Sequence, residues 1–157
     1  MKQGAGPALR IGASAVAIEG RALLIEGPPG SGKSSLCLAL IDRGARLIGD
    51  DGVQLKRQGD TIFAAPPPRC AGLIEVRGVG LVSLPIAQAA PLALILALEG
   101  VPERLPESAP TREMLGCAVP CLPFAPGPIA PALRAEWALR VHGLPIAAAG
   151  ARISIGG

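Results

Sequence analysis

The stretch LLIEGPPGSGKSSLCLALIDRG, Leu23 to Gly44, decides the fold. It begins as a short apolar run, passes through a turn rich in glycine and proline, and then repeats apolar residues at helical spacing, at Leu36, Ala39 and Leu40. Gly44 suits the end of a helix, because glycine readily adopts the left-handed conformation that closes one. The stretch therefore predicts a strand, a loop and a helix, in that order.

The loop in this stretch fits the pattern G-x-x-x-x-G-K-[ST] of phosphate-binding loops. Its glycines let successive backbone N–H groups converge on phosphate oxygens, and the following helix adds the positive end of its dipole. Lys33 is expected to reach the β- and γ-phosphates of ATP, and Ser34 to offer its hydroxyl to Mg²⁺. The expected nucleotide contacts are Gly27, Pro28, Pro29, Gly30, Ser31, Gly32, Lys33, Ser34 and Ser35. A glycine-rich turn that carries Gly-Lys-Ser by chance is the alternative, which the flanking strand and helix disfavour.

Composition narrows the class of protein. The 157 residues carry 15 basic and 12 acidic side chains, which are spread along the chain, and the only aromatic residues are one Trp and two Phe. Nucleic-acid surfaces usually combine clustered cations with stacking rings, so this class is disfavoured. The longest apolar runs, such as Leu92 to Leu98, are far shorter than the roughly 20 residues of a membrane helix. We expect one soluble domain.

The N-terminal segment lacks the continuous apolar core of a signal peptide, which predicts a cytoplasmic protein. Its cysteines are scattered, with one C-x-x-x-C pair and no second pair to complete a zinc site. We expect reduced, structural thiols at Cys37, Cys70, Cys117 and Cys121.

Turn residues and hydrophobic spacing predict the other elements. The expected strands form a hairpin over 13–18 and 21–26, a strand over 46–48, a second hairpin over 53–57 and 61–64, a strand-loop-strand unit within 72–84, and a buried strand over 92–98. The proline-rich segment 117–131 is expected to lack regular structure before Pro131. A C-terminal helix is expected to pack on the sheet through the apolar residues Ile129, Leu133, Trp137 and Val141. The last residues, 151–157, are expected to form a flexible tail.

Two further clusters follow the loop. Asp50 and Asp51 end a predicted strand, where one carboxylate can face Mg²⁺ or its water shell and the other an incoming hydroxyl. An ordinary Asp-Asp-Gly turn is the alternative. Glu75 and Arg77, in EVRGVG, lie two residues apart and so share one face of a strand. They can complete a metal shell and neutralise phosphate charge, or form a surface ion pair.

The order of these motifs, GPPGSGKS, then RLIGDD, then LIEVRGVGLV, resembles the catalytic domain of HPr kinase/phosphorylase, particularly the short bacterial forms that lack the N-terminal domain. The resemblance covers roughly residues 11–107. It implies an α/β fold, a single P-loop kinase domain of the type shared with phosphoenolpyruvate carboxykinase, with a mixed sheet and flanking helices over residues 1–150. It also implies ATP-dependent phosphorylation of a serine on the phosphocarrier protein HPr, a reaction that many members reverse by phosphorolysis, and a homo-oligomer, often a hexamer.

The resemblance assigns roles by motif. Asp51 looks like the acceptor of the serine proton, and Glu75 like the second metal ligand beside Ser34. The carboxylate of the pair that can face the metal is then Asp50. Lys33 keeps its phosphate role. Arg77, or Arg104 in PERLPE, where the family has a catalytic arginine, is expected to stabilise charge on the transferring phosphate.

Three departures from the family pattern are visible. Short members carry a histidine where this chain has Gly12, the family has an acidic residue where this chain has Ser35, and the element PVRPGRN of the long forms has no counterpart in LPFAPGPIAP. The lone His142 is expected to be a surface residue of the C-terminal helix. We therefore expect a kinase with weak or no phosphorylase activity. A regulatory nucleotide-binding module that has lost catalysis, and a small-molecule kinase, are the alternatives.

Overall fold

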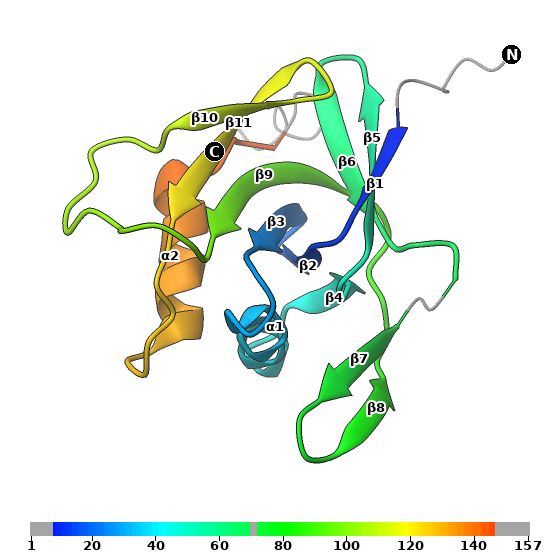
Figure 1. Ribbon diagram of the computed structural model, residues 1–157. Helices are drawn as coiled ribbons and strands as arrows, with labels where there is room; N and C mark the ends of the chain where they lie inside the picture. Colours follow the sequence, from blue (N-terminus) through cyan, green and yellow to red (C-terminus); the bar gives the residue numbers. More distant parts are fainter. Residues whose placement is uncertain (1–7, 70–71, 147–157) are drawn as a thin grey trace, which may run out of the picture.

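The computed structural model describes residues 8–69 and 72–146 (Figure 1). Within these ranges the chain forms eleven strands and two helices. The strands are β1 (Ala8–Ile11), β2 (Ser14–Ile18), β3 (Arg21–Glu26), β4 (Arg46–Gly49), β5 (Val53–Gln58), β6 (Thr61–Ala65), β7 (Leu73–Val76), β8 (Gly80–Ser83), β9 (Ala90–Ala97), β10 (Thr111–Met114) and β11 (Cys117–Pro123). The helices are α1 (Lys33–Asp42) and α2 (Pro131–His142).

Nine of the strands form one mixed sheet in the order β1-β5-β6-β9-β3-β2-β4, with β11 paired to β9 and β10 paired to β11. The central strands β3, β9 and β11 run parallel, whereas β2 runs antiparallel to both β3 and β4. The carboxyl ends of β3 and β4 therefore lie at the same edge of the sheet as the amino end of β2. This edge is where a mixed α/β sheet presents its ligand-binding loops.

The two faces of the sheet are covered differently. Both helices pack on one face, where Leu23 and Leu94 from the sheet share a buried cluster with Leu40 of α1 and Leu139 of α2. On the other face, Leu24 and Ile95 share a second buried cluster with residues of β5 and β6. The expected α/β fold with a mixed sheet and flanking helices is confirmed at this level.

The turn signals predicted the antiparallel pairs correctly. β2 and β3 form the expected hairpin, as do β5 and β6, and β7 pairs with β8 in a separate two-stranded sheet that projects from the body (Figure 1). Helix α1 starts at Lys33 after Gly32 in a left-handed conformation, and the backbone N–H of Gly44, whose φ is 112°, donates to the carbonyl of Ile41 beyond its last turn. The strand over Leu92 to Leu98 is confirmed as β9.

The prediction that residues 117–131 lack regular structure was wrong. The segment contains β11, which pairs with both β9 and β10. Its prolines lie where a ladder tolerates them: Pro120 faces Thr111, the first residue of β10, and Pro123 is the last residue of β11. Between β9 and β10 the described chain forms no strand or helix, so a long loop joins these two strands.

Helix α2 exists and packs on the sheet, but the predicted contact face was wrong. Ile129, Leu133, Trp137 and Val141 are 75%, 39%, 54% and 66% exposed. The buried face consists of Ala132, Ala135, Glu136, Ala138 and Leu139. Small alanine side chains let the helix approach the sheet and α1 closely, and Arg43 at the end of α1 binds the Glu136 carboxylate at 2.9 Å.

Two expectations concern residues outside the described ranges, namely the flexible tail at 151–157 and the thiol of Cys70. Cys37, Cys117 and Cys121 are free thiols. In the described part of the chain no helix is long and apolar enough to cross a membrane.

Candidate active site

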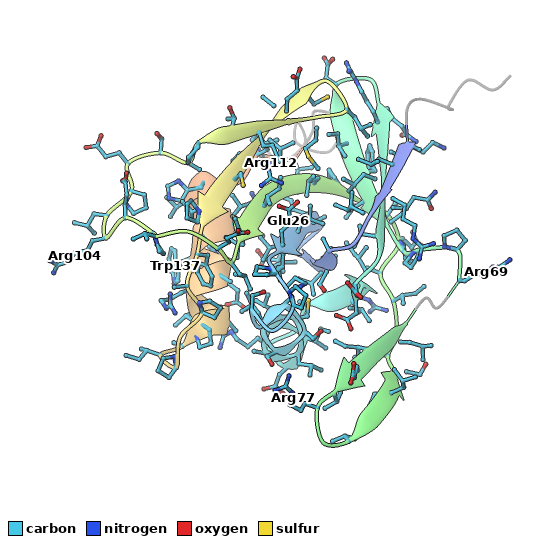
Figure 2. All side chains as sticks on the ribbon, viewed as in Figure 1. Glu26, Arg69, Arg77, Arg104, Arg112 and Trp137 are labelled. Carbon is cyan, nitrogen blue, oxygen red and sulfur yellow. The ribbon has the colours of Figure 1, made fainter. Side chains whose placement is uncertain are left out.

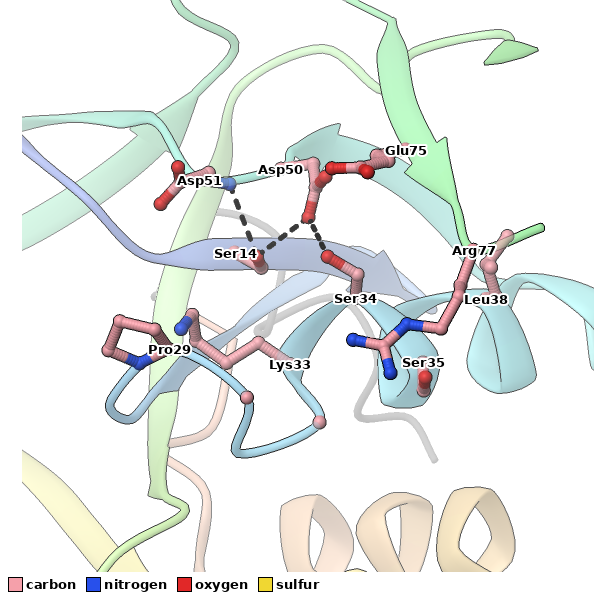
Figure 3. Close-up of a pocket in the computed structure, with 12 residues that line it drawn as sticks. Ser14, Pro29, Lys33, Ser34, Ser35, Leu38, Asp50, Asp51, Glu75 and Arg77 are labelled. Atoms are coloured by element: carbon pink, nitrogen blue, oxygen red, sulfur yellow. Dashed lines mark hydrogen bonds between the residues drawn. The ribbon is translucent and has the colours of Figure 1, made fainter. Parts of the chain in front are cut away.

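A cavity of about 480 Å³ opens at the sheet edge where β3 and β4 end and β2 begins (Figure 3). It is lined by Ser14, Pro29, Gly30, Gly32, Lys33, Ser34, Ser35, Leu38, Asp50, Asp51, Glu75 and Arg77. Three parts of the chain meet here: the loop between β3 and α1, the turn after β4, and the hairpin β7–β8. Each part carries one of the motifs found in the sequence.

The loop from Gly27 to Gly32 has the backbone of a phosphate cradle. Gly30 and Gly32 have φ values of 82° and 101°, conformations that favour glycine. A Cβ at Gly27 would lie 2.5 Å from Ser31 Oγ and 3.0 Å from Leu98 Cβ, so any other residue here would displace the Ser31 side chain. Lys33 Nζ donates to the carbonyls of Gly27 and Pro28, at 2.8 and 3.3 Å, and so folds back over its own loop.

The loop also contains an unsatisfied polar group. Ser31 Oγ is buried and has no hydrogen-bond partner among the described residues. A buried hydroxyl without a partner is costly in a folded protein. Together with the glycine conformations, this group fits a loop that receives anionic oxygens.

The turn after β4 brings Asp50 and Asp51 to the cavity. Ser34 Oγ, in the first turn of α1, donates to Asp50 Oδ1 at 2.7 Å, and Ser14 Oγ donates to the same oxygen at 3.0 Å. Asp51 has a φ of 60°, a left-handed conformation unusual for a residue with a side chain, and it is exposed. The two carboxylates therefore diverge: Asp50 points to the start of α1, and Asp51 lies at the open side (Figure 3).

The hairpin β7–β8 supplies the remaining charges. Glu75 enters the cavity on the side of Asp50, and Arg77 on the side of Ser35 (Figure 3). Ile74, on the opposite face of β7, is fully buried in the cluster that contains α1. Because successive side chains of a strand point to opposite faces, Ile74 anchors the hairpin in the buried cluster while Glu75 points into the cavity.

Arg104 lies apart from this cavity. It lines a second cavity of about 410 Å³, formed with the end of β11 and the exposed face of α2, and Figure 2 shows it far from Arg77. The half-buried His142 lines the same second cavity. Arg104 was predicted among the catalytic residues, but the structure does not bring it to the cavity that holds them.

Two residues near the turn were not assigned a role from the sequence. Ser14 lines the cavity from the start of β2, and the only signal in the sequence was a polar residue inside an apolar strand. Cys37, one turn after Ser34, is buried, and burial together with the nearby Asp50 charge raises the pKa of its thiol well above the ordinary value. Cys37 therefore stays protonated beneath the site.

The position of Gly12 adjoins the Asp51 carboxylate. A Cβ built at Gly12 would have Asp51 Oδ1 as its nearest neighbour, at 3.9 Å. A larger residue at this position would contact Asp51. The glycine leaves that side of the carboxylate open.

Comparison with known proteins identifies the family. The model of the HPr Serine kinase C-terminal domain matches residues 6–127. The chain belongs to this family. HPr kinase/phosphorylase of Shouchella clausii is 43% identical over 70 residues, which are 44% of this chain and 23% of that protein. HPr kinase/phosphorylase of Clostridium acetobutylicum is 40% identical over 79 residues, 50% of this chain and 26% of that protein.

The fold agrees with a solved HPr kinase structure. The Hpr(Ser) kinase/phosphatase from Coxiella burnetii superimposes with a TM-score of 0.72 at 26% identity, covering 84% of this chain and 89% of that one. The matches to the curated HPr kinase/phosphorylases span about a quarter of those proteins' length. Membership of the HPr kinase family is thus shown for the domain that carries the cavity.

Proposed function

We propose that the chain is an ATP-dependent protein serine kinase that phosphorylates HPr or a related phosphocarrier of a bacterial phosphotransferase system, and so regulates carbon or nitrogen metabolism. One observation carries the proposal: a single cavity joins a phosphate-type loop, the Asp50–Asp51 turn and the Glu75–Arg77 hairpin. Family membership supports it, because the relatives are named HPr kinase/phosphorylase. Action in the cytoplasm and assembly into a homo-oligomer are parts of the same proposal.

The loop is suited to hold the triphosphate of ATP. The amides around Gly30 and Gly32 and the unpartnered Ser31 hydroxyl provide donors, and α1 adds its positive end. Lys33 now donates to carbonyls of the loop, and its ammonium can exchange these partners for phosphate oxygens.

Ser34, Asp50 and Glu75 are suited to hold Mg²⁺ with the phosphates. All three offer oxygen ligands, which this cation prefers, and Mg²⁺ usually takes few protein ligands when phosphates complete its shell. Within the described residues no group of three His, Cys, Asp or Glu side chains forms a metal site by itself, which agrees with a site completed by substrate. When bound, the ion would neutralise charge on the transferring phosphoryl group.

Asp51 is suited to accept the proton of the substrate serine. Its carboxylate is exposed at the open side of the cavity, where an acceptor protein can approach, and Asp50 is held separately by Ser14 and Ser34. Arg77 faces the loop and can stabilise charge on the transferring phosphate. Because Arg104 lines the other cavity, we assign this role to Arg77 alone.

We expect the kinase direction to dominate. The side of Asp51 where short family members carry a histidine is open at Gly12, and the chain lacks a counterpart of the PVRPGRN element of the long forms. Phosphorolysis is therefore expected to be weak or absent.

The test is transfer of labelled γ-phosphate from ATP to a purified HPr-type phosphocarrier, with phosphoserine as the product. We predict that Asp51→Asn lowers the transfer rate by about 100-fold or more, because a positioned general base typically contributes that much, while ATP affinity stays near that of the parent protein. Asp60→Asn, in the exposed turn between β5 and β6, is the matched control and is expected to leave transfer unchanged.

Other results have definite meanings. Unimpaired transfer by Asp51→Asn would remove this carboxylate from the mechanism. ATP binding without transfer to any phosphocarrier would favour the regulatory module, for which the absence of the family's histidine and acidic residue at Gly12 and Ser35 is the reason to consider it. Transfer to a small metabolite instead would identify a small-molecule kinase.

A further inference from the structure

Ser14 is a buried hydroxyl beneath the candidate proton acceptor. Among the described residues, Ser14 and Glu136 are the two polar residues that are buried as whole residues, and Ser14 is fully inaccessible to solvent although it lines the cavity. Ser14 is the first residue of β2. It pairs with Ile25, near the end of β3, where the chain enters the phosphate loop. A polar side chain in such a place needs partners from the protein.

Two hydrogen bonds join Ser14 to the Asp50–Asp51 turn, and the buried Cys37 thiol lies beside its hydroxyl. Its Oγ donates its hydrogen to Asp50 Oδ1 at 3.0 Å and accepts the backbone N–H of Asp51 at 3.2 Å (Figure 3). One hydroxyl thus fixes the carboxylate of one aspartate and the backbone of the other. We infer that Ser14 is a positioning residue that sets where both carboxylates stand relative to the phosphate loop; its catalytic consequence rests on the proposed function.

The turn depends on this anchor because its own conformation is unfavourable. Asp51 is left-handed, and a Cβ at Gly49 would lie 2.1 Å from the carbonyl oxygen of Gly52. Such conformations persist only when the surroundings impose them. The chain entering β2 does so at two successive amides. Asp51 N–H donates to Ser14 Oγ, and Gly52 N–H donates to the carbonyl of Ala13, the residue before β2, at 2.9 Å.

Asp50 gains a second, independent support from Ser34, which donates to the same Oδ1 at 2.7 Å. Ser34 is also the residue expected to bind the metal. If its hydroxyl turns to a metal ion, Ser14 remains the hydrogen-bond donor on Asp50. The two serines therefore play different parts: Ser34 can change partner, and Ser14 keeps the turn in place.

Ser14→Ala tests the inference in the full-length chain. We expect phosphotransfer at saturating ATP to fall by about 10- to 100-fold, the effect of losing a hydrogen bond to a charged group, with affinity for metal-free ATP within about twofold of the parent. Hydrogen exchange at the Asp51 amide, followed by NMR, is expected to accelerate. Ala22→Gly, which removes a buried methyl group from β3 away from the cavity, is the control for simple destabilisation of the sheet.

A transfer rate within about twofold of the parent, or Asp51 exchange that does not change, would overturn the inference. The inference would also be overturned if Ala22→Gly lowered the melting temperature and the transfer rate by as much as Ser14→Ala does. Ser14 would then act only through the stability of the sheet. If the parent protein transfers phosphate to no acceptor, the proposed function fails. The hydrogen-exchange rate at the Asp51 amide then tests by itself whether Ser14 holds the turn.

Discussion

At the scale of single residues, the site depends on places where only glycine or a strained backbone fits. Gly27 directly follows β3, and a Cβ there would lie 2.5 Å from Ser31 Oγ and 3.0 Å from Leu98 Cβ. Leu98 directly follows β9 and is buried, so it cannot easily move away from a side chain at position 27. The cost of a methyl group at Gly27 must therefore fall on the loop.

We predict that Gly27→Ala weakens MgATP binding by about tenfold or more, because overpacking of this kind costs roughly 1–3 kcal/mol and displaces Ser31. Equilibrium titration with a fluorescent ATP analogue measures the effect. Gly12→Ala, where the nearest atom lies at 3.9 Å, is the control and is expected to bind ATP like the parent. Equal binding by both variants would contradict the loop geometry described above.

At the scale of elements, α2 shows how a regular pattern can mislead. Apolar residues recur every four positions at Leu133, Trp137 and Val141, yet these side chains face solvent or the second cavity. The face that packs is rich in alanine, which scores low as a hydrophobic signal but allows close approach of a helix to a sheet. Arg140 stacks on the Trp137 ring at 4.9 Å, which partly shields the exposed face.

Two truncations on α2 distinguish its faces. Leu139→Ala is expected to lower the free energy of unfolding by about 2–5 kcal/mol, as for other fully buried leucines, and Val141→Ala to change it by less than about 0.5 kcal/mol, as for exposed sites. Denaturant titration gives both values. A larger loss for Val141→Ala than for Leu139→Ala would restore the face that the sequence pattern predicts.

The elements differed in how well local sequence predicts them, for physical reasons. Hairpins such as β2–β3 were predictable because a turn dipeptide separates two apolar runs. Strands β10 and β11 were not, because Pro120 and Pro123 suggest irregular chain. These strands form because β11 pairs with β10 on its first half and with β9 on its second half. The phosphate loop was predicted from its motif, but the part of Ser14 depends on a contact across 36 residues, which spacing alone does not reveal.

At the scale of the whole molecule, topology brings distant segments to one edge. The directions of β2, β3 and β4 place Ser14, the phosphate loop and Asp50 side by side, although β3 and β4 are separated by α1. The buried clusters on the two faces of the sheet hold these strands in register. A ligand at this edge therefore contacts elements whose positions depend on the entire core.

For this reason we predict that MgATP stabilises the whole domain. At about 100 times its dissociation constant it should add about 2.7 kcal/mol to the free energy of unfolding, which calorimetry detects as a higher melting temperature. Chelation of Mg²⁺ should reduce the shift, and Lys33→Ala should nearly abolish it. An equal shift for Lys33→Ala would place the nucleotide elsewhere.

Because β7 and β8 form a separate two-stranded sheet, we expect this ribbon to open before the rest of the domain unfolds. A two-stranded ribbon has little stability of its own and depends here on the contact of Ile74 with the helix-covered core. Local opening of the ribbon removes Glu75 and Arg77 while the larger sheet and its loop remain folded. Mild heat or denaturant would thus leave a molecule that still retains nucleotide but has lost its means of passing the phosphate on.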